Sequence, residues 1–403
     1  MSPKPLLPLR DALDQLLSDA VPRVGTAEVS LNESLGRVLA FDQHALIDVP
    51  PADNSAMDGY ALRSTDAGRC LPISERIAAG DPAHALASDS IARIFTGGEI
   101  PDGADAVVMQ EDVVAKAELV ELPGTIRTGQ HIRAKGQDCQ AGDRLLARGR
   151  RIRPQDMGLL ASQGIAQVSV FNKLRVALLS TGNELQEPGS GPLPAGAIYN
   201  SNRPMLFGLL TALGCDVVDL GIVRDTASAT LDALSEAAGR ADLIVSSGGV
   251  SVGEADHVRD SVNALGKIDL WRIAIKPGKP FAFGHVGSTP FIGVPGNPSS
   301  AFVTFVLLAR PYIRAMQGRS ELSSDLLPAR ADFSVPNKGS REEFLRVSTC
   351  LKAGEVWASP YANQSSGVLS SVSASDALAI VPVGEMIELG QAIQLMPLDS
   401  LLY

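Results

Sequence analysis

The feature that most constrains the fold is a strand–helix alternation between residues 174 and 321. Short apolar runs predict strands at 174–181, 215–223, 241–249, 269–276, 280–287 and 291–296. Between or after them, longer stretches predict helices at 202–214, 226–239, 254–266 and 297–316. Apolar strands alternating with helices indicate a mostly parallel sheet that is covered on both faces. We therefore expect a central three-layer α/β domain.

The regions on either side of this alternation follow other patterns. Residues 5–40 read as helical segments, whereas 73–123 and 322–403 alternate short β-type runs with turn residues. A length of 403 residues allows about two to four domains. We expect a discontinuous N-terminal helical and linker domain, a β-rich insertion domain, the α/β domain and a C-terminal, small β-barrel-like domain. Their predicted boundaries are 1–46 plus 139–173, 47–138, 174–321 and 322–403.

Charge and composition exclude several functions. The formal net charge is −10 and aromatic residues are only 4%, so a basic face or a base-stacking platform for nucleic acid is not expected. No apolar run approaches the roughly 20 residues that a membrane span needs. The cysteines are scattered without a C-x-x-C pair, which argues against structural zinc. We expect a cytoplasmic protein with no nucleic-acid or membrane partner.

Polar, glycine-rich segments follow the predicted strands of the α/β domain. They are STGNEL (180–185), GIVRDT (221–226), SSGGVSVGEAD (246–256), IKPGKP (275–280) and VPGNPSS (294–300). Ligands of open α/β sheets bind at the carboxyl ends of the strands. Each segment alone is also what an ordinary turn would use. Five of them at one sheet edge favour a binding crevice.

The segment 246–256 combines glycines with the start of a helix. Its successive backbone N–H groups can bind a phosphate or pyrophosphate, and Glu254 and Asp256 would lie in the first turn of the helix. Two acids at that position can simply complement the helix dipole. A carboxylate beside a phosphate is also where Mg²⁺ would be bound.

The remaining segments add charges of both signs. In IKPGKP, prolines restrict Lys276 and Lys279 to extended backbone, which favours an oxyanion clamp over a pair of solvated lysines. In VPGNPSS, Gly296 and Asn297 can adopt a left-handed turn before a helix. The predicted crevice therefore contains three carboxylates (Glu184, Asp225 and Asp256) and two lysines, a mixture that suits a metal–phosphate ligand.

A serine hydrolase is a competing interpretation. Residues 249–253 fit the G-x-S-x-G nucleophile motif, and Ser251, Asp269 and His285 follow the chain order of an α/β-hydrolase triad. The preceding Gly248 lengthens the loop beyond a tight elbow, and this chemistry leaves the two lysines unexplained. The motif alone has a high false-positive rate.

Taken together, the motifs resemble the molybdopterin molybdenumtransferase (MoeA) family, which also forms the C-terminal part of gephyrin. The resemblance rests on DNSAMDGYA (53–61), RIFTGGEIPDGADAVVMQED (93–112), GQDCQAGD (136–143) and the five segments above. Related adenylyltransferases share the G-G-x-S-x-G-x-x-D core. The full set, DNSAMDGYA and IKPGKP above all, is similar to the molybdenum-inserting members.

The resemblance implies an enzyme that uses Mg²⁺, adenylylated molybdopterin and molybdate, and that releases AMP and molybdenum cofactor. It also implies a homodimer with the site at the interface. The adenylyltransferase and the recipient molybdoenzymes would be partners. The catalytic residues it implies are Asp53, Asp225, Asp256, Lys276 and Lys279, with Glu184, Asp225 and Asp256 as Mg²⁺ ligands. The substrate-binding residues it implies are Thr96, Asp138, Glu184, Gly248, Gly249, Ser251, Pro295, Pro298, Arg346 and Ser366.

The chain departs from the family pattern at three positions. Asn183 and Thr226 stand where the family often has acids, and QSSG (364–367) replaces Q-G-S-G. An adenylyltransferase on the same core, which would consume ATP, and a non-enzymatic scaffold remain the alternative functions. The sequence does not distinguish molybdate from tungstate, since the two anions have nearly the same size and charge.

Overall fold

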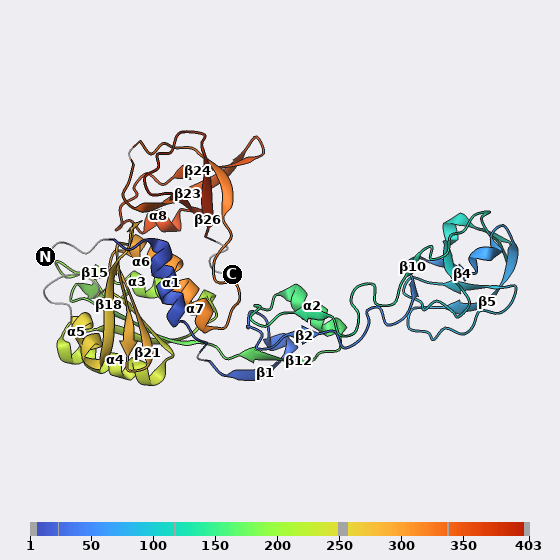
Figure 1. The fold of residues 1–403 in the computed structure, drawn as a ribbon, viewed down its shortest axis with the longest axis horizontal. Helices are drawn as coiled ribbons and strands as arrows, with labels where there is room; N and C mark the ends of the chain where they lie inside the picture. Colours follow the sequence, from blue (N-terminus) through green and yellow to red (C-terminus); the bar gives the residue numbers. More distant parts are fainter. Residues whose placement is uncertain (1–5, 23, 117, 249–256, 337, 399–403) are drawn as a thin grey trace.

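The computed structural model describes residues 6–22, 24–116, 118–248, 257–336 and 338–398. The chain is elongated (Figure 1). The α/β domain and the C-terminal barrel lie together at one end, a small N-terminal module lies in the middle, and an inserted β-rich module lies at the other end. The expected combination of α/β and β-rich domains is confirmed.

The central sheet has six strands in the order β16-β13-β17-β21-β20-β18. The parallel strands are β16 (Asp216–Val223), β13 (Arg175–Thr181), β17 (Leu243–Ser247) and β21 (Thr289–Val294). The antiparallel strands are β20 (Pro280–Val286) and β18 (Gly266–Arg272). The sheet is therefore mostly parallel, as predicted, with one antiparallel edge. A connection of only two residues joins β20 to β21, and such a short turn can connect only antiparallel strands.

Helices cover both faces of this sheet. One face carries α1 (Leu9–Asp19), α3 (Asn202–Ala212) and a long helix made of α6 (Pro298–Thr304), a π-helical turn η4 (Phe305–Ala309) and α7 (Arg310–Met316). The other face carries α4 (Ala227–Arg240) and α5 (His257–Leu265). In β13, Val176 and Leu178 face the first layer, while Ala177 and Leu179 face the second. This two-sided burial explains why the strand is a continuous apolar run.

The N-terminal module is partly β-structured, which corrects the helical prediction for residues 5–40. After α1, the chain forms β1 (Thr26–Ser30) and a 3₁₀ turn, η1 (Leu31–Glu33). β1 pairs with β12 (Gln167–Phe171), and β2 (Gln43–His44) pairs with β11 (Arg144–Leu146). Val29 packs on the core beneath α2 (Pro154–Ser162), so a partner strand more than 130 residues away overrides the local pattern.

The inserted module is a six-stranded sheet in the order β7-β4-β6-β5-β9-β8. Its elements are β4 (Gly59–Leu62), η2 (Ser64–Asp66), β5 (Cys70–Ile77), β6 (Ile91–Ile94), β7 (Ala106–Met109), η3 (Gln110–Asp112), β8 (Val114–Lys116) and β9 (Leu119–Glu121). A short pair, β3 (Asn54–Ser55) with β10 (Ile132–Arg133), lies where the chain enters and leaves the module.

The C-terminal region is a closed barrel. Its strands are β22 (Leu327–Ala331), β23 (Glu342–Lys352), β24 (Glu355–Pro360), β25 (Ala377–Val381) and β26 (Ala392–Pro397), with a short helix α8 (Ser370–Ser373). The pairing of β23 with β25 closes the ring. β19 (Ile275–Lys276) adds to β23 from outside and so links the α/β domain to the barrel. The predicted barrel-like domain is confirmed.

Candidate functional site

A cavity of about 830 Å³ opens at the carboxyl ends of the four parallel strands. Each strand delivers a predicted residue to its wall. Glu184 follows β13, Asp225 follows β16, Gly248 follows β17, and Pro295 and Pro298 follow β21. The crevice predicted from the strand ends is therefore present, as expected for an open α/β sheet.

The floor of the cavity is held by polar contacts between neighbouring strand ends. The hydroxyls of Ser180 and Ser247 lie 2.7 Å apart and are buried. Gly248 has φ +90°, and a Cβ at this position would lie 2.8 Å from the carbonyl oxygen of Thr181. Only glycine therefore allows the chain to turn out of β17 so close to β13.

The two described acids of the cavity are available to bind a cation. Glu184 is exposed and Asp225 is half-buried. Within the described ranges, neither carboxylate forms an ion pair. The backbone carbonyl of Glu184 accepts a hydrogen bond from Ile198, which fixes the loop before β15 (Ile198–Tyr199), the partner of β14 (Leu185–Gln186). Two carboxylates in the wall of one cavity fit the oxygen preference of Mg²⁺.

Helix starts surround the cavity, and polar side chains hold two of them. Thr226, where the family often has an acid, caps α4 by accepting a hydrogen bond from the Ala229 N–H. Asn202 lies inside α3, and its Nδ2 donates to the carbonyl of Gly296 at 2.6 Å. Asn297 has φ −68°, and neither it nor Gly296 is left-handed, so that prediction is wrong. The turn at Gly296 and Asn297 is instead fixed by the hydrogen bond from Asn202 to the Gly296 carbonyl.

The two predicted lysines have different environments. Lys276 lies in β19, and its Nζ is 3.0 Å from Oε1 of Glu343 on the barrel strand β23. Lys279 is half-buried and has no ion-pair partner among the residues described, and it directly precedes Pro280, which lines the cavity. The two lysines therefore do not form a symmetric clamp, and Lys279 is the one available to an anion.

The barrel contributes a loop to the cavity wall. Gly367 and Leu369 line the cavity, and the carbonyl of Ser366 accepts a hydrogen bond from the N–H of Ser299 at 3.0 Å. Arg346 is only 1% exposed, and burial lowers its pKa. Its guanidinium donates to Ser371 Oγ and to the Ser365 carbonyl, so it supports the loop from behind.

Three predicted residues lie far from this cavity in the same chain. Asp53 and Thr96 belong to the inserted module (Figure 1), and Asp138 lies in the segment between β10 and β11 by which the chain returns from it. The Asp53 carboxylate accepts a hydrogen bond from the Lys135 N–H at 2.7 Å. The backbone N–H and the hydroxyl of Thr96 both donate to Asp58 Oδ1, each at 2.8 Å.

Asp58 is therefore a candidate site residue that the sequence analysis missed. The hydrogen bonds from the Thr96 backbone and hydroxyl lower the pKa of Asp58. Both acids occur in the motif DNSAMDGYA, so the signal was present in the sequence. The motif alone does not tell which carboxylate faces Thr96.

Some predicted residues lie outside the described residues, namely Gly249, Ser251 and Asp256. The two other members of the hydrolase triad are described. Asp269 pairs with Lys267 at 3.1 Å, and His285 contacts Asp19 at 3.3 Å. Neither residue lines the cavity, so the hydrolase interpretation is not favoured.

An open α/β sheet with a cavity of about 830 Å³ at its strand ends is a ligand-binding architecture. Three family profiles match in order along the chain. They are described as MoeA N-terminal region (domain I and II), residues 7–164, probable molybdopterin binding domain, residues 177–315, and MoeA C-terminal region (domain IV), residues 328–398.

Curated relatives cover most of the chain. A molybdopterin molybdenumtransferase from Haemophilus influenzae is 42% identical over 78% of this chain and 79% of its own length. One from a Nostoc species is 34% identical over 95% of this chain and 93% of its own length. The chain belongs to the molybdopterin molybdenumtransferase (MoeA) family.

Solved structures agree over the whole length. A molybdopterin biosynthesis MoeA protein from Pyrococcus horikoshii OT3 superimposes with a TM-score of 0.84 at 29% identity, covering 98% of this chain and 100% of that one. A second structure from this organism gives 0.79 at 31% identity, covering 98% and 99%. Within the described ranges, no helix combines the length and apolar character needed to cross a bilayer.

Proposed function

We propose that this chain inserts molybdenum from molybdate into molybdopterin. The observation that carries the proposal is the strand-end cavity, where two carboxylates and three helix starts converge. Lys279 directly precedes Pro280, which lines the same cavity. Helix N-termini and a lysine suit an anionic substrate, whereas the carboxylates suit a cation bound with it. The names of the relatives, which cover most of the chain, support the same reaction.

In the more detailed form of the proposal, the substrate is adenylylated molybdopterin and the products are AMP and molybdenum cofactor. Glu184 and Asp225, with Asp256, would hold Mg²⁺. A bound Mg²⁺ offsets negative charge on the phosphates during their cleavage. Lys279 binds the incoming oxyanion. The barrel loop at 364–369 forms the wall of the cavity on the barrel side. The dithiolene sulfurs belong to the pterin, so no protein cysteine needs to receive the metal.

The proposal also includes a homodimer in the cytoplasm. The inserted module is separated from the cavity of its own chain by the N-terminal module (Figure 1). If Asp58 and Thr96 take part in the reaction, they act on the cavity of a partner subunit. The adenylyltransferase and recipient molybdoenzymes are the expected protein partners.

The decisive experiment is an anaerobic incubation with adenylylated molybdopterin, Mg²⁺ and molybdate, with AMP measured over time. AMP release that depends on molybdate is expected. Asp225→Asn should reduce it at least tenfold, because it removes one cation ligand. Asp232→Asn, which removes an exposed acid on α4 outside the cavity, should leave it unchanged. Pyrophosphate release from ATP and molybdopterin would instead identify an adenylyltransferase.

A further inference from the structure

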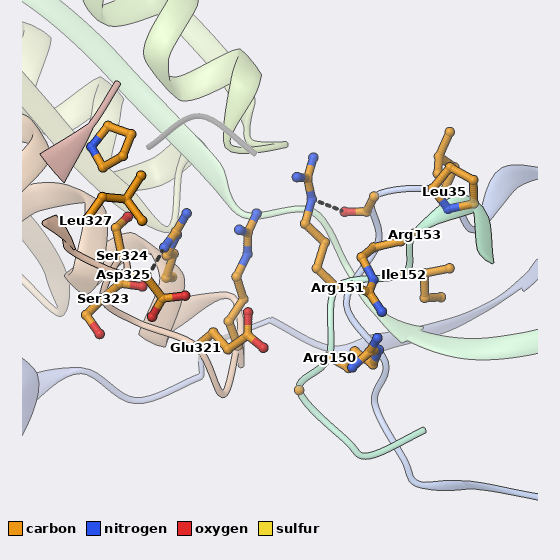
Figure 2. Close-up of a pocket in the computed structure, with 16 residues that line it drawn as sticks. Leu35, Arg150, Arg151, Ile152, Arg153, Glu321, Ser323, Ser324, Asp325 and Leu327 are labelled. Carbon is orange, nitrogen blue, oxygen red and sulfur yellow. Dashed lines mark hydrogen bonds between the residues drawn. The ribbon is translucent and has the colours of Figure 1, made fainter. Parts of the chain in front are cut away.

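A second cavity, of about 800 Å³, lies between the N-terminal module and the end of α7. Figure 2 shows Arg150, Arg151 and Arg153 on one side of it and the segment with Glu321, Ser323 and Asp325 on the other. It shares no lining residue with the strand-end cavity. Five arginines line it, namely Arg150, Arg151, Arg153, Arg314 and Arg319, against two acids, Glu321 and Asp325.

Two of these arginines have unused hydrogen-bonding capacity. Arg314 is only 4% exposed, and its Nε has no hydrogen-bond partner among the described residues, although its Nη1 donates to the Ser323 carbonyl at 3.3 Å. Arg319 donates from Nη2 to the Leu213 carbonyl at 2.8 Å, and its Nε is likewise buried without a partner there. In the described part of the chain, neither guanidinium pairs with a carboxylate.

The charges of this cluster repel one another. Burial lowers the pKa of Arg314 and lowers that of Arg319 to about 10, and the neighbouring arginine charges act in the same direction. Glu321 opposes both shifts, but it is exposed. Arg150 and Arg153 instead share Asp156, at 3.0 and 3.1 Å. Like charges buried together without matching acids need a counter-ion.

We propose that this arginine pocket binds a small phosphate-bearing polyanion. Guanidinium forks bind phosphate oxygens in pairs, and here they approach from two sides of one cavity. The cavity volume lies within the range of small-molecule sites. Such a ligand would join the N-terminal module to the end of α7 and would fix the angle between them. This inference does not depend on the proposed function.

The test uses the full chain and isothermal titration calorimetry at low salt. Inorganic pyrophosphate and AMP are titrated separately, which distinguishes a simple phosphate from a nucleotide phosphate. Pyrophosphate should bind, and added salt should weaken the binding because charges are screened. Arg319→Gln and Arg314→Gln should each weaken binding at least tenfold. Arg319→Lys should weaken it less, because lysine keeps the positive charge although it lacks the paired N–H donors of a guanidinium.

Two control variants locate the binding. Arg240→Gln removes an exposed arginine on α4 outside both cavities and should leave the affinity unchanged. Lys279→Ala should also leave pyrophosphate bound at the arginine pocket. Thermal unfolding of each variant confirms that it is folded. The proposal is overturned if neither probe binds, if the Arg319 and Arg314 variants bind as tightly as the original chain, or if Lys279→Ala alone abolishes binding.

Discussion

The two lysines of the IKPGKP segment illustrate how a single partner changes the expected role of a residue. Lys276 is held by Glu343, whereas Lys279 is half-buried and directly precedes Pro280, which lines the cavity. Lys279→Ala should raise the KM for molybdate about tenfold or more, because a charge-assisted hydrogen bond contributes about 1.5–3 kcal/mol. Lys276→Ala should raise it less. AMP release measured over a range of molybdate concentrations tests both, and equal effects of the two substitutions would contradict this distinction.

The cysteines provide a second prediction at the residue scale. Burial raises the pKa of Cys215 to about 12, whereas Cys70 and Cys350 are exposed. At pH 8 a thiol with this pKa has only about one thiolate in 10⁴ molecules, and the thiolate is the reactive form. Iodoacetamide should therefore label Cys70 and Cys350 in the native protein and Cys215 only after unfolding. Peptide mass spectrometry reads the labelling directly, and rapid native labelling of Cys215 would show that it is not buried.

The sequence could identify site segments at this scale but could not always select the residue. Glu184 and Asp225 were predictable because they follow apolar strands whose carboxyl ends must share one edge. Asp58 was not, since its role depends on the fold bringing Thr96 within hydrogen-bonding distance across 38 positions of sequence. Arg346 was expected at the substrate, but the barrel buries it behind the loop.

At the scale of elements, the turn between β19 and β20 places Lys279. Gly278 has φ +108°, and a Cβ there would lie 2.4 Å from Thr304 Oγ1 on α6. Gly278→Ala should lower the Tm and raise the KM for molybdate, because a non-glycine residue in this conformation costs about 1–3 kcal/mol. Gly158 lies within α2 and has open space around it, so Gly158→Ala should instead raise the free energy of unfolding by about 0.5–1 kcal/mol. An unchanged Tm for Gly278→Ala would mean that the turn can rearrange.

Elements were predictable where their pattern is local. β13 is buried on both faces and reads as an uninterrupted apolar run. β1 was missed because it is stabilised by β12, far along the chain. The closure of the barrel by β23 and β25 is likewise a long-range pairing that no local period reveals.

For the whole molecule, the main consequence is the separation of the two groups of candidate residues. The carboxylates of the cavity lie in the α/β domain, whereas Asp58 and Thr96 lie at the opposite end of the elongated chain (Figure 1). One chain therefore cannot assemble all of them. A closed twofold dimer would place the module of each subunit near the cavity of the other, giving two sites that each depend on both chains.

This arrangement predicts complementation between defective subunits. Asp225→Asn and Asp58→Asn should each be nearly inactive alone. After the two variants are mixed under conditions that exchange subunits, half of the dimers are mixed. Each mixed dimer has one site with both defects and one with neither, so about a quarter of the original AMP release should return. Mixing Asp225→Asn with Glu184→Gln, whose defects lie in the same cavity, should restore nothing. Recovery in that control, or none in the first mixture, would contradict a site shared between subunits.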